Sequence, residues 1–210
     1  RLTFGGGCEL VEVSVSGYLQ SWRYFQGFEA TIRRAYEAPP EDRAQADAWI
    51  AGLRARLHAA DPTTRRWRFI GVQVRRGDKV HTPAFQAVYE PTDWSYYRRG
   101  MLQLREKLEG PGDTVVFVVT AGGAMGRDAR DIEEAKALAS VSEHIVFAEG
   151  MDAYVDYALL TSHMEGMVIS AGSFGWWMAF MSPAGSAEEM VVCPKYLYKA
   201  SHPLAKHFDA

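Results

Sequence analysis

Phe69-Ile-Gly-Val-Gln-Val-Arg-Arg-Gly-Asp-Lys79 is an apolar run that ends in two arginines. The run predicts a buried strand from Trp67 to Val74. The two arginines after it carry permanent charge on planar guanidinium groups, which suit a phosphate better than lysine does. Gly77 permits a sharp turn or a close approach of the backbone to a ligand. The stretch therefore predicts an anion site at the end of a strand. The alternative is a solvated strand end that closes in a surface turn.

The length, composition and charge of the chain limit the classes of protein to which it can belong. The chain has 210 residues, enough for one large domain or for a full domain with part of another. A hydrophobic content of 48% and a charged content of 23% are those of an ordinary globular protein. The net charge of -3 gives no overall attraction to nucleic acid or to an acidic membrane. Charge is uneven, because several cations lie in a segment whose only acid is Asp78: Arg65, Arg66, Arg68, Arg75, Arg76 and Lys79. This cluster favours a local anion site.

The cysteines and histidines indicate no metal site. Cys8 and Cys193 lie far apart and match no metal or redox spacing, so they either pair in an oxidising compartment or remain two buried thiols. The histidines do not cluster in sequence, and no metal is assigned. No apolar run reaches the roughly 20 residues that a transmembrane helix requires.

Strands and helices alternate along the chain. The predicted strands are Glu9–Val15, Trp67–Val74, Thr114–Thr120, His144–Ala148, Gly166–Ser170 and Glu189–Cys193. The predicted helices are Phe28–Tyr36, Glu41–Ala60, Asp93–Glu109, Asp128–Ser140, Asp152–Met164 and one that ends at Met181. The segment that holds Pro83 and Pro91 is predicted to be a loop. Such alternation predicts βαβ units and an α/β fold with a parallel sheet.

Parallel sheets bind ligands at the carboxyl ends of their strands. Four segments follow predicted strands and should lie along one edge of the sheet: Arg75–Lys79, Thr120–Gly123, Ala148–Asp152 and Gly172–Gly175. This edge is the predicted position of the functional site.

A second anion-binding feature is Ala171-Gly-Ser-Phe-Gly-Trp176, a glycine-rich turn that opens a helix. The backbone amides and dipole of a helix N-terminus favour an anion. Ser173 adds a hydroxyl to such a site, or else it is the N-cap of an ordinary helix. The side chains that follow at helical spacing are predicted to be core: Trp176, Trp177, Phe180 and Met181.

These segments resemble the signatures of a known family. Gly71-Val-Gln-Val-Arg-Arg-Gly-Asp78 resembles the first signature, His-x-Arg-Arg-Gly-Asp, of the family 11 glycosyltransferases, the α-1,2-fucosyltransferases. Gly17-Tyr-Leu-Gln-Ser-Trp-Arg-Tyr-Phe25 is similar to the stretch upstream of that signature, and Phe117-Val-Val-Thr120 to the second signature strand. Asp156-Tyr-Ala-Leu-Leu-Thr161, followed by Gly172-Ser-Phe-Gly-Trp-Trp177, is similar to the third.

The resemblance implies a two-lobed GT-B architecture. Residues 67–210 would be a Rossmann-like lobe that binds GDP-fucose, and residues 1–66 the end of the acceptor-side lobe with its connecting helices. Arg75 or Arg76 would neutralise the diphosphate, and Asp156 would accept from the guanine edge or be an ordinary first-turn acid. The other implied donor contacts are Gln73, Thr120, Gly172, Ser173, Phe174 and Gly175.

The implied activity is transfer of L-fucose from GDP-β-L-fucose to the 2-hydroxyl of a galactose-containing glycan, with inversion and without a metal. Arg75 and Asp78 are the implied catalytic residues, although Asp78 could instead be locked to an arginine. No cofactor is implied beyond the donor, and no nucleic acid is a partner. Eukaryotic members face the Golgi lumen and bacterial ones are cytoplasmic, so any membrane anchor would lie outside this chain.

Three departures from the family pattern accompany the match. Gln73 replaces the family histidine and cannot shuttle a proton. Ala121-Gly-Gly-Ala-Met125 replaces a polar continuation that leads to Trp-Cys. His163 and Glu165 fall near the usual Cys and His positions. A catalytically inactive GDP-sugar-binding or glycan-binding relative therefore remains an alternative, as does a protein O-fucosyltransferase.

Overall fold

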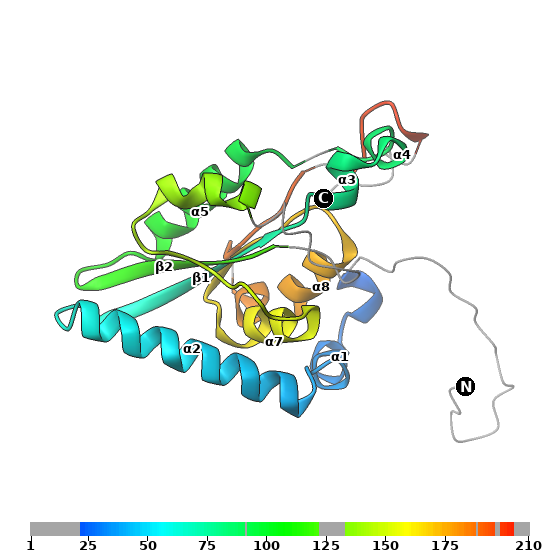
Figure 1. Cartoon of the computed structure of the whole chain (residues 1–210). Coiled ribbons are helices and arrows are strands. Elements are labelled where there is room, and N and C mark those ends of the chain that lie inside the picture. Colours follow the sequence, from blue (N-terminus) through cyan, green and yellow to red (C-terminus); the bar gives the residue numbers. More distant parts are fainter. Residues whose placement is uncertain (1–21, 91, 122–132, 188, 196–197, 204–210) are drawn as a thin grey trace, which may run out of the picture.

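The computed structural model describes residues 22–90, 92–121, 133–187, 189–195 and 198–203 (Figure 1). Within them the chain forms a five-stranded parallel sheet in the order β3-β2-β1-β4-β5. Its strands are β1 Arg66–Val74, β2 Asp113–Ala121, β3 Ile145–Phe147, β4 Gly166–Val168 and β5 Val191–Val192. This order is that of Rossmann-like folds and confirms the predicted α/β class. The predicted strand Glu9–Val15 lies outside the described residues.

The helices connect these strands. They are η1 Trp22–Phe25, α1 Glu29–Ala35, α2 Pro40–Ala60, α3 Gly77–His81, α4 Pro83–Gln86, α5 Trp94–Leu108, η2 Lys136–Val141, α7 Ala153–His163, α8 Ser173–Met181 and η3 Pro183–Ser186. The predictions for α1, α2, α5, α7 and α8 are confirmed. Two of these helices begin at an aspartate cap: Asp93 accepts from the backbone N–H of Tyr96 at 2.7 Å, and Asp152 from that of Tyr154 at 2.9 Å.

Two predictions for connecting segments need correction. The segment around Pro83 was expected to be a loop, but it contains α3 and α4. Proline is well suited to the start of a helix, because the first N–H groups have no partner within the helix. Of the helix expected over Asp128–Ser140, residues 128–132 lie outside the description, and its end forms the 3-10 helix η2 rather than an α-helix.

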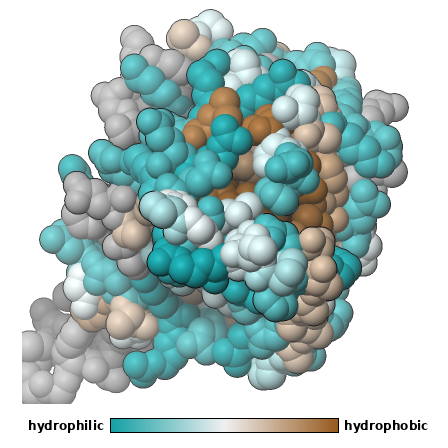
Figure 2. Space-filling view, turned by 90° about the vertical axis from the view of Figure 1, so that its left-hand side faces the viewer, coloured by the Kyte–Doolittle hydropathy of each residue, from teal (hydrophilic) through white to brown (hydrophobic). Residues whose placement is uncertain are grey.

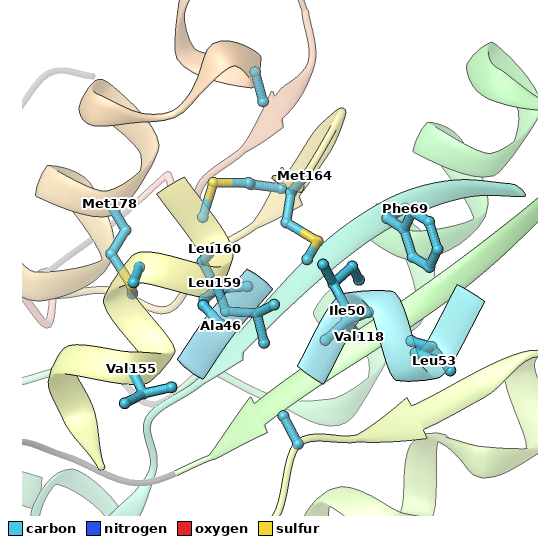
Figure 3. Close-up of a cluster of buried hydrophobic side chains, with 14 of the residues drawn as sticks. Ala46, Ile50, Leu53, Phe69, Val118, Val155, Leu159, Leu160, Met164 and Met178 are labelled. Carbon is cyan, nitrogen blue, oxygen red and sulfur yellow. The ribbon is translucent and has the colours of Figure 1, made fainter. Parts of the chain in front are cut away.

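Helices cover both faces of the sheet (Figure 1). Along β1, Ile70 and Val72 point into a core with α5 and η2, whereas Phe69 points to the opposite face. That face is covered by α2, α7 and α8, and Figure 3 shows side chains of this core, among them Ile50 of α2, Leu160 of α7 and Phe69. Helix α2 thus shares a core with β1, and the domain boundary predicted between residues 66 and 67 falls within β1.

Gly71 in β1 marks the closest approach of α7 to the sheet. A Cβ atom at this position would lie 2.7 Å from Leu160 Cδ2 and 3.0 Å from Met164 Cγ. Gly71→Ala is therefore expected to lower the free energy of unfolding by about 1–3 kcal/mol through overpacking. Urea titration measures this change. The control is Gly52→Ala in α2, whose Cβ would meet only Arg56 Nη1 at 3.7 Å; there we expect a gain of about 0.5–1 kcal/mol. Equal stability of the two variants would contradict this packing.

Candidate functional site

The strand order places a topological switch point between β1 and β4, because the chain proceeds to β2 on one side of β1 and to β4 on the other. Open parallel sheets bind ligands at such a point, beyond the carboxyl ends of the strands. Here the residues after β1 and those after β4 meet, which brings together the predicted segments Arg75–Lys79 and Gly172–Gly175.

Ser170 joins the two strand ends. Its hydroxyl donates to the carbonyl of Gln73 at 2.8 Å, accepts from the backbone N–H of Arg75 at 2.7 Å, and lies 2.6 Å from the hydroxyl of Tyr97. With its one proton on Gln73, Ser170 accepts from both other groups, so its bonding capacity is full. Tyr97 is then the donor to Ser170, and burial raises the pKa of its phenol to about 12. This network fixes the backbone from which the Arg75 side chain extends.

Arg75 and Lys79 converge on the residue before α8. A Cβ atom built on Gly172 would lie 3.6 Å from Lys79 Nζ and 3.9 Å from Arg75 Nη1. The Lys79 side chain is buried, donates to the carbonyl of Ala171, and has its ammonium 4.7 Å from the centre of the Tyr89 ring. Two cations therefore approach the N-terminus of α8 from the β1 side.

The N-terminus of α8 adds to this positive potential. Its N-cap is Gly172, with a φ of 156° that favours glycine and no side chain with which to cap the helix. Ser173 is the first helical residue and not the N-cap, which corrects that alternative. Arg75, Lys79 and the helix dipole together suit an anion of high charge density, such as a diphosphate.

Arg76 points into a different environment from Arg75. Its guanidinium lies 4.6 Å from the centre of the Trp94 ring, donates to the carbonyl of Thr92, and is 3.4 Å from a carboxylate oxygen of Glu134. These contacts hold α3 against the start of α5. Of the two arginines that the sequence left open, Arg75 is the one beside Gly172.

The remaining cations of the basic segment lie at the opposite end of β1. Arg65 bonds Asp113 at 2.9 Å, and this hydrogen bond holds the pKa of that carboxyl below its usual range. Arg66 and Arg68 each contact Glu165 at 2.8 Å. The amino ends of β1 and β2 face the viewer in Figure 2, where the surface is mostly hydrophilic with a hydrophobic band. The sequence cluster thus divides into Arg65, Arg66 and Arg68 at this end and Arg75, Arg76 and Lys79 at the other.

Three of the predicted donor-binding residues are buried beneath the site. The Gln73 amide oxygen accepts from the backbone N–H of Ser170 at 3.1 Å, and Thr120 lies opposite Gln73 in the register of β1 and β2. Gly175 has no room for a side chain, because a Cβ there would lie 2.9 Å from Gln73 Oε1. These residues lie in the core beneath the strand ends and support the structure there.

The other predicted site residues are placed as follows. Ser173 and Phe174 are half-buried in the first turn of α8, and Asp156 is half-buried in the first turn of α7. The structure places the backbone of Asp78 in α3, but its side chain lies outside what is described. Lys79 was missing from the predicted site, although its place in the basic cluster was a signal.

An aromatic hollow adjoins Phe174. Its volume is about 590 Å³, and its lining includes Phe25, Tyr36, Tyr154, Tyr157, Phe174 and Trp177. The prediction that the aromatics of α8 are core is wrong, since Trp176, Trp177, Phe180 and Met181 are only half-buried. Helix α8 instead buries its smaller face, formed by Gly175, Met178 and Ala179, against the sheet.

The described residues contain neither a metal-binding cluster nor a membrane-spanning helix. No group of three or more His, Cys, Asp or Glu among them could hold a metal ion. None of the helices in this part of the chain combines the length and apolarity needed to cross a bilayer. Cys193 is an exposed thiol, and Cys8 lies outside the description.

Comparisons with known proteins agree with this fold. The sequence profile of glycosyl transferase family 11 matches residues 10–202. Galactoside alpha-(1,2)-fucosyltransferase 2 of Rattus norvegicus is 30% identical over 174 residues, which cover 81% of this chain and 44% of the relative. Galactoside alpha-(1,2)-fucosyltransferase 1 of Homo sapiens is 30% identical over 174 residues, covering 81% and 43%. The fucosyltransferase 2 of Oryctolagus cuniculus is 32% identical over 177 residues, covering 81% and 44%. No solved structure matches the chain significantly.

The fold and site define a Rossmann-like protein with two cations beside a helix N-terminus at its switch point. The profile match extends over most of the sequence, so the chain belongs to glycosyl transferase family 11. It spans less than half the length of the curated relatives it matches.

Proposed function

We propose that the protein is a fucosyltransferase that moves L-fucose from GDP-β-L-fucose to the 2-hydroxyl of a galactose-type glycan. The observation that carries this proposal is the convergence of Arg75 and Lys79 on the N-terminus of α8 at the switch point. Membership of family 11 favours a nucleotide sugar among possible anions, and the relatives, which are galactoside alpha-(1,2)-fucosyltransferases, suggest the fucosyl group and the galactoside. Residues 67–210 would form the donor lobe.

The chemistry requires stabilisation of a leaving diphosphate. As the bond from the fucosyl carbon to the phosphate oxygen breaks, the carbon gains oxocarbenium character and negative charge builds on the GDP. Arg75, Lys79 and the amides of α8 would meet that charge, and their effect is larger in the transition state than in the ground state. Fixed cations of this kind can stabilise the leaving diphosphate without a metal ion. Ser173 would add a hydroxyl to the phosphate oxygens.

The remaining roles rest on the resemblance to family 11. Attack by the acceptor hydroxyl on the face opposite the diphosphate converts a β-linked donor to an α-linked product. Asp78 is the proposed base, and Asp156 the proposed partner of the guanine edge. Gln73, Thr120 and Gly175 would position the strand ends. In a eukaryote the proposal goes with a Golgi lumenal location, and in a bacterium with a cytoplasmic one.

A catalytically inactive donor-binding relative is the second candidate, and Gln73 favours it. This residue stands where the family signature has a histidine, and its side chain is buried and bonded to Ser170. It can hold structure there, but it cannot transfer a proton. A protein O-fucosyltransferase is a further alternative with a different acceptor.

The first test is calorimetric titration of GDP and GDP-fucose into the protein in EDTA. We expect micromolar dissociation constants, or roughly -8 kcal/mol. Incubation with GDP-fucose and lactose should then release GDP and form fucosylated lactose. Donor binding without product would favour the inactive relative. A folded protein that binds neither nucleotide would contradict the donor-site assignment.

A further inference from the structure

The aromatic hollow beside α8 is built from segments far apart in the sequence. Phe25 comes from η1, Tyr36 follows α1, Tyr157 lies in α7, and Phe174 and Trp177 lie in α8. The volume of about 590 Å³ falls within the range of about 300–1,000 Å³ typical of small-molecule sites.

The rings are held in a defined arrangement. Tyr36 stacks on Trp177 with 5.4 Å between ring centres and 15° between planes, and Phe25 lies 5.3 Å from Trp177. The hydroxyl of Tyr157 donates to the carbonyl of Tyr36 at 2.8 Å, which ties α7 to the segment after α1. The hollow therefore has fixed walls.

Two of the aromatic rings remain open to solvent. Tyr154 is 68% exposed and Tyr36 is 56% exposed, although both line the hollow. Exposed aromatics around a concavity are a feature of binding sites, since an isolated monomer gains nothing from leaving such rings in water. The polar groups at the rim include the Glu37 carboxylate, which is 3.4 Å from Arg43.

This combination suits a sugar ring. A pyranose has a face rich in C–H groups that stacks on aromatic rings, while its hydroxyls reach polar groups at the edge. A purine base would need donors and acceptors that read its edge, and the proposed guanine partner Asp156 lies about 200° around the α7 axis from Tyr154. The base would thus lie on a different side of α7.

The hollow reaches the first turn of α8, where Phe174 lines it and the preceding residue, Ser173, belongs to the proposed phosphate site. We propose that the aromatic hollow binds a pyranose ring of the transfer reaction, stacked against Tyr36, Tyr154 and Trp177. This inference rests on the proposed function. The ring belongs either to the galactoside acceptor or to the fucosyl group of the donor, and the two sources are separable by experiment.

The test compares two variants whose side chains are exposed in similar degree. Tyr154→Ala alters the hollow, whereas Tyr24→Ala removes a tyrosine that is 64% exposed and does not line it. Lactose, GDP and GDP-fucose are titrated into each protein, with the indole signals followed by NMR. For an acceptor ring, Tyr154→Ala should weaken lactose binding at least about tenfold and leave GDP affinity within about twofold. If the hollow binds the donor ring, Tyr154→Ala should weaken the binding of GDP-fucose but not that of GDP. Tyr24→Ala should change neither.

Three results would overturn the inference. One is loss of GDP affinity in Tyr154→Ala, which would assign the hollow to the base. Another is unchanged affinity of that variant for both sugars. The third is an equal loss in Tyr24→Ala. Absence of GDP binding by the wild type would instead count against the proposed function, since lactose binding at the hollow is measured separately.

Discussion

Arg75→Ala is expected to weaken GDP binding by about 10- to 150-fold, or about 1.5–3 kcal/mol. The Arg75 guanidinium lies beside Gly172 at the N-terminus of α8, together with Lys79. Removing it takes away a charge-assisted contact to the diphosphate and leaves one cation with the helix dipole. Calorimetry in EDTA measures the change, and thermal unfolding of the same sample checks that the variant remains folded.

Arg76→Ala is the matched control for this prediction. Arg76 stacks on Trp94 and pairs with Glu134, so its loss should lower stability and leave GDP affinity within about threefold. Arg75→Lys separates charge from shape, because lysine keeps the charge but loses the planar fork, and it should recover only part of the affinity. A larger loss of GDP affinity in Arg76→Ala than in Arg75→Ala would show that the two roles are reversed.

The fold could be predicted from the sequence because the apolar runs are long and charged or capping residues mark their ends. The strand from Trp67 to Val74 stops at charged residues, and α5 and α7 begin at Asp93 and Asp152, which cap them as their residue type predicts. Such signals depend only on residues that are close together in the sequence. The carboxyl-edge rule then placed Arg75 near Gly172 without knowledge of the strand order.

The choice between neighbouring residues could not be made from the sequence. Arg75 and Arg76 are the same residue type, and their environments differ only because β1 is followed by α3, which turns Arg76 toward Trp94. The aromatics of α8 were misplaced for a similar reason. Helical spacing identifies a face but not which of two faces meets the sheet, and here the face with Gly175 and Ala179 allows the closer approach.

Ser170 is the residue whose importance the sequence least reveals, and Ser170→Ala is expected to cost about 2–4 kcal/mol of unfolding free energy. The variant leaves the Gln73 carbonyl, the Arg75 N–H and the Tyr97 hydroxyl without the partner that each has now. Buried polar groups that lose their partner cost about 1–3 kcal/mol each, partly offset by relaxation. Chemical denaturation measures the loss, and Tyr97→Phe, which removes one member of the network, should cost about 0.5–1.5 kcal/mol.

The same variant also tests how the strand ends support the anion site. Because Ser170 holds the backbone of Arg75, Ser170→Ala should weaken GDP binding by about three- to tenfold in protein that is still folded. Ser182→Ala is the control: Ser182 is equally buried and bonds Ala179 and Gly185, away from β1. It should lose stability but not affinity. If both variants lose affinity alike, the effect is one of general loosening, whereas a loss confined to Ser170→Ala means that the Ser170 network sets the position of the Arg75 charge.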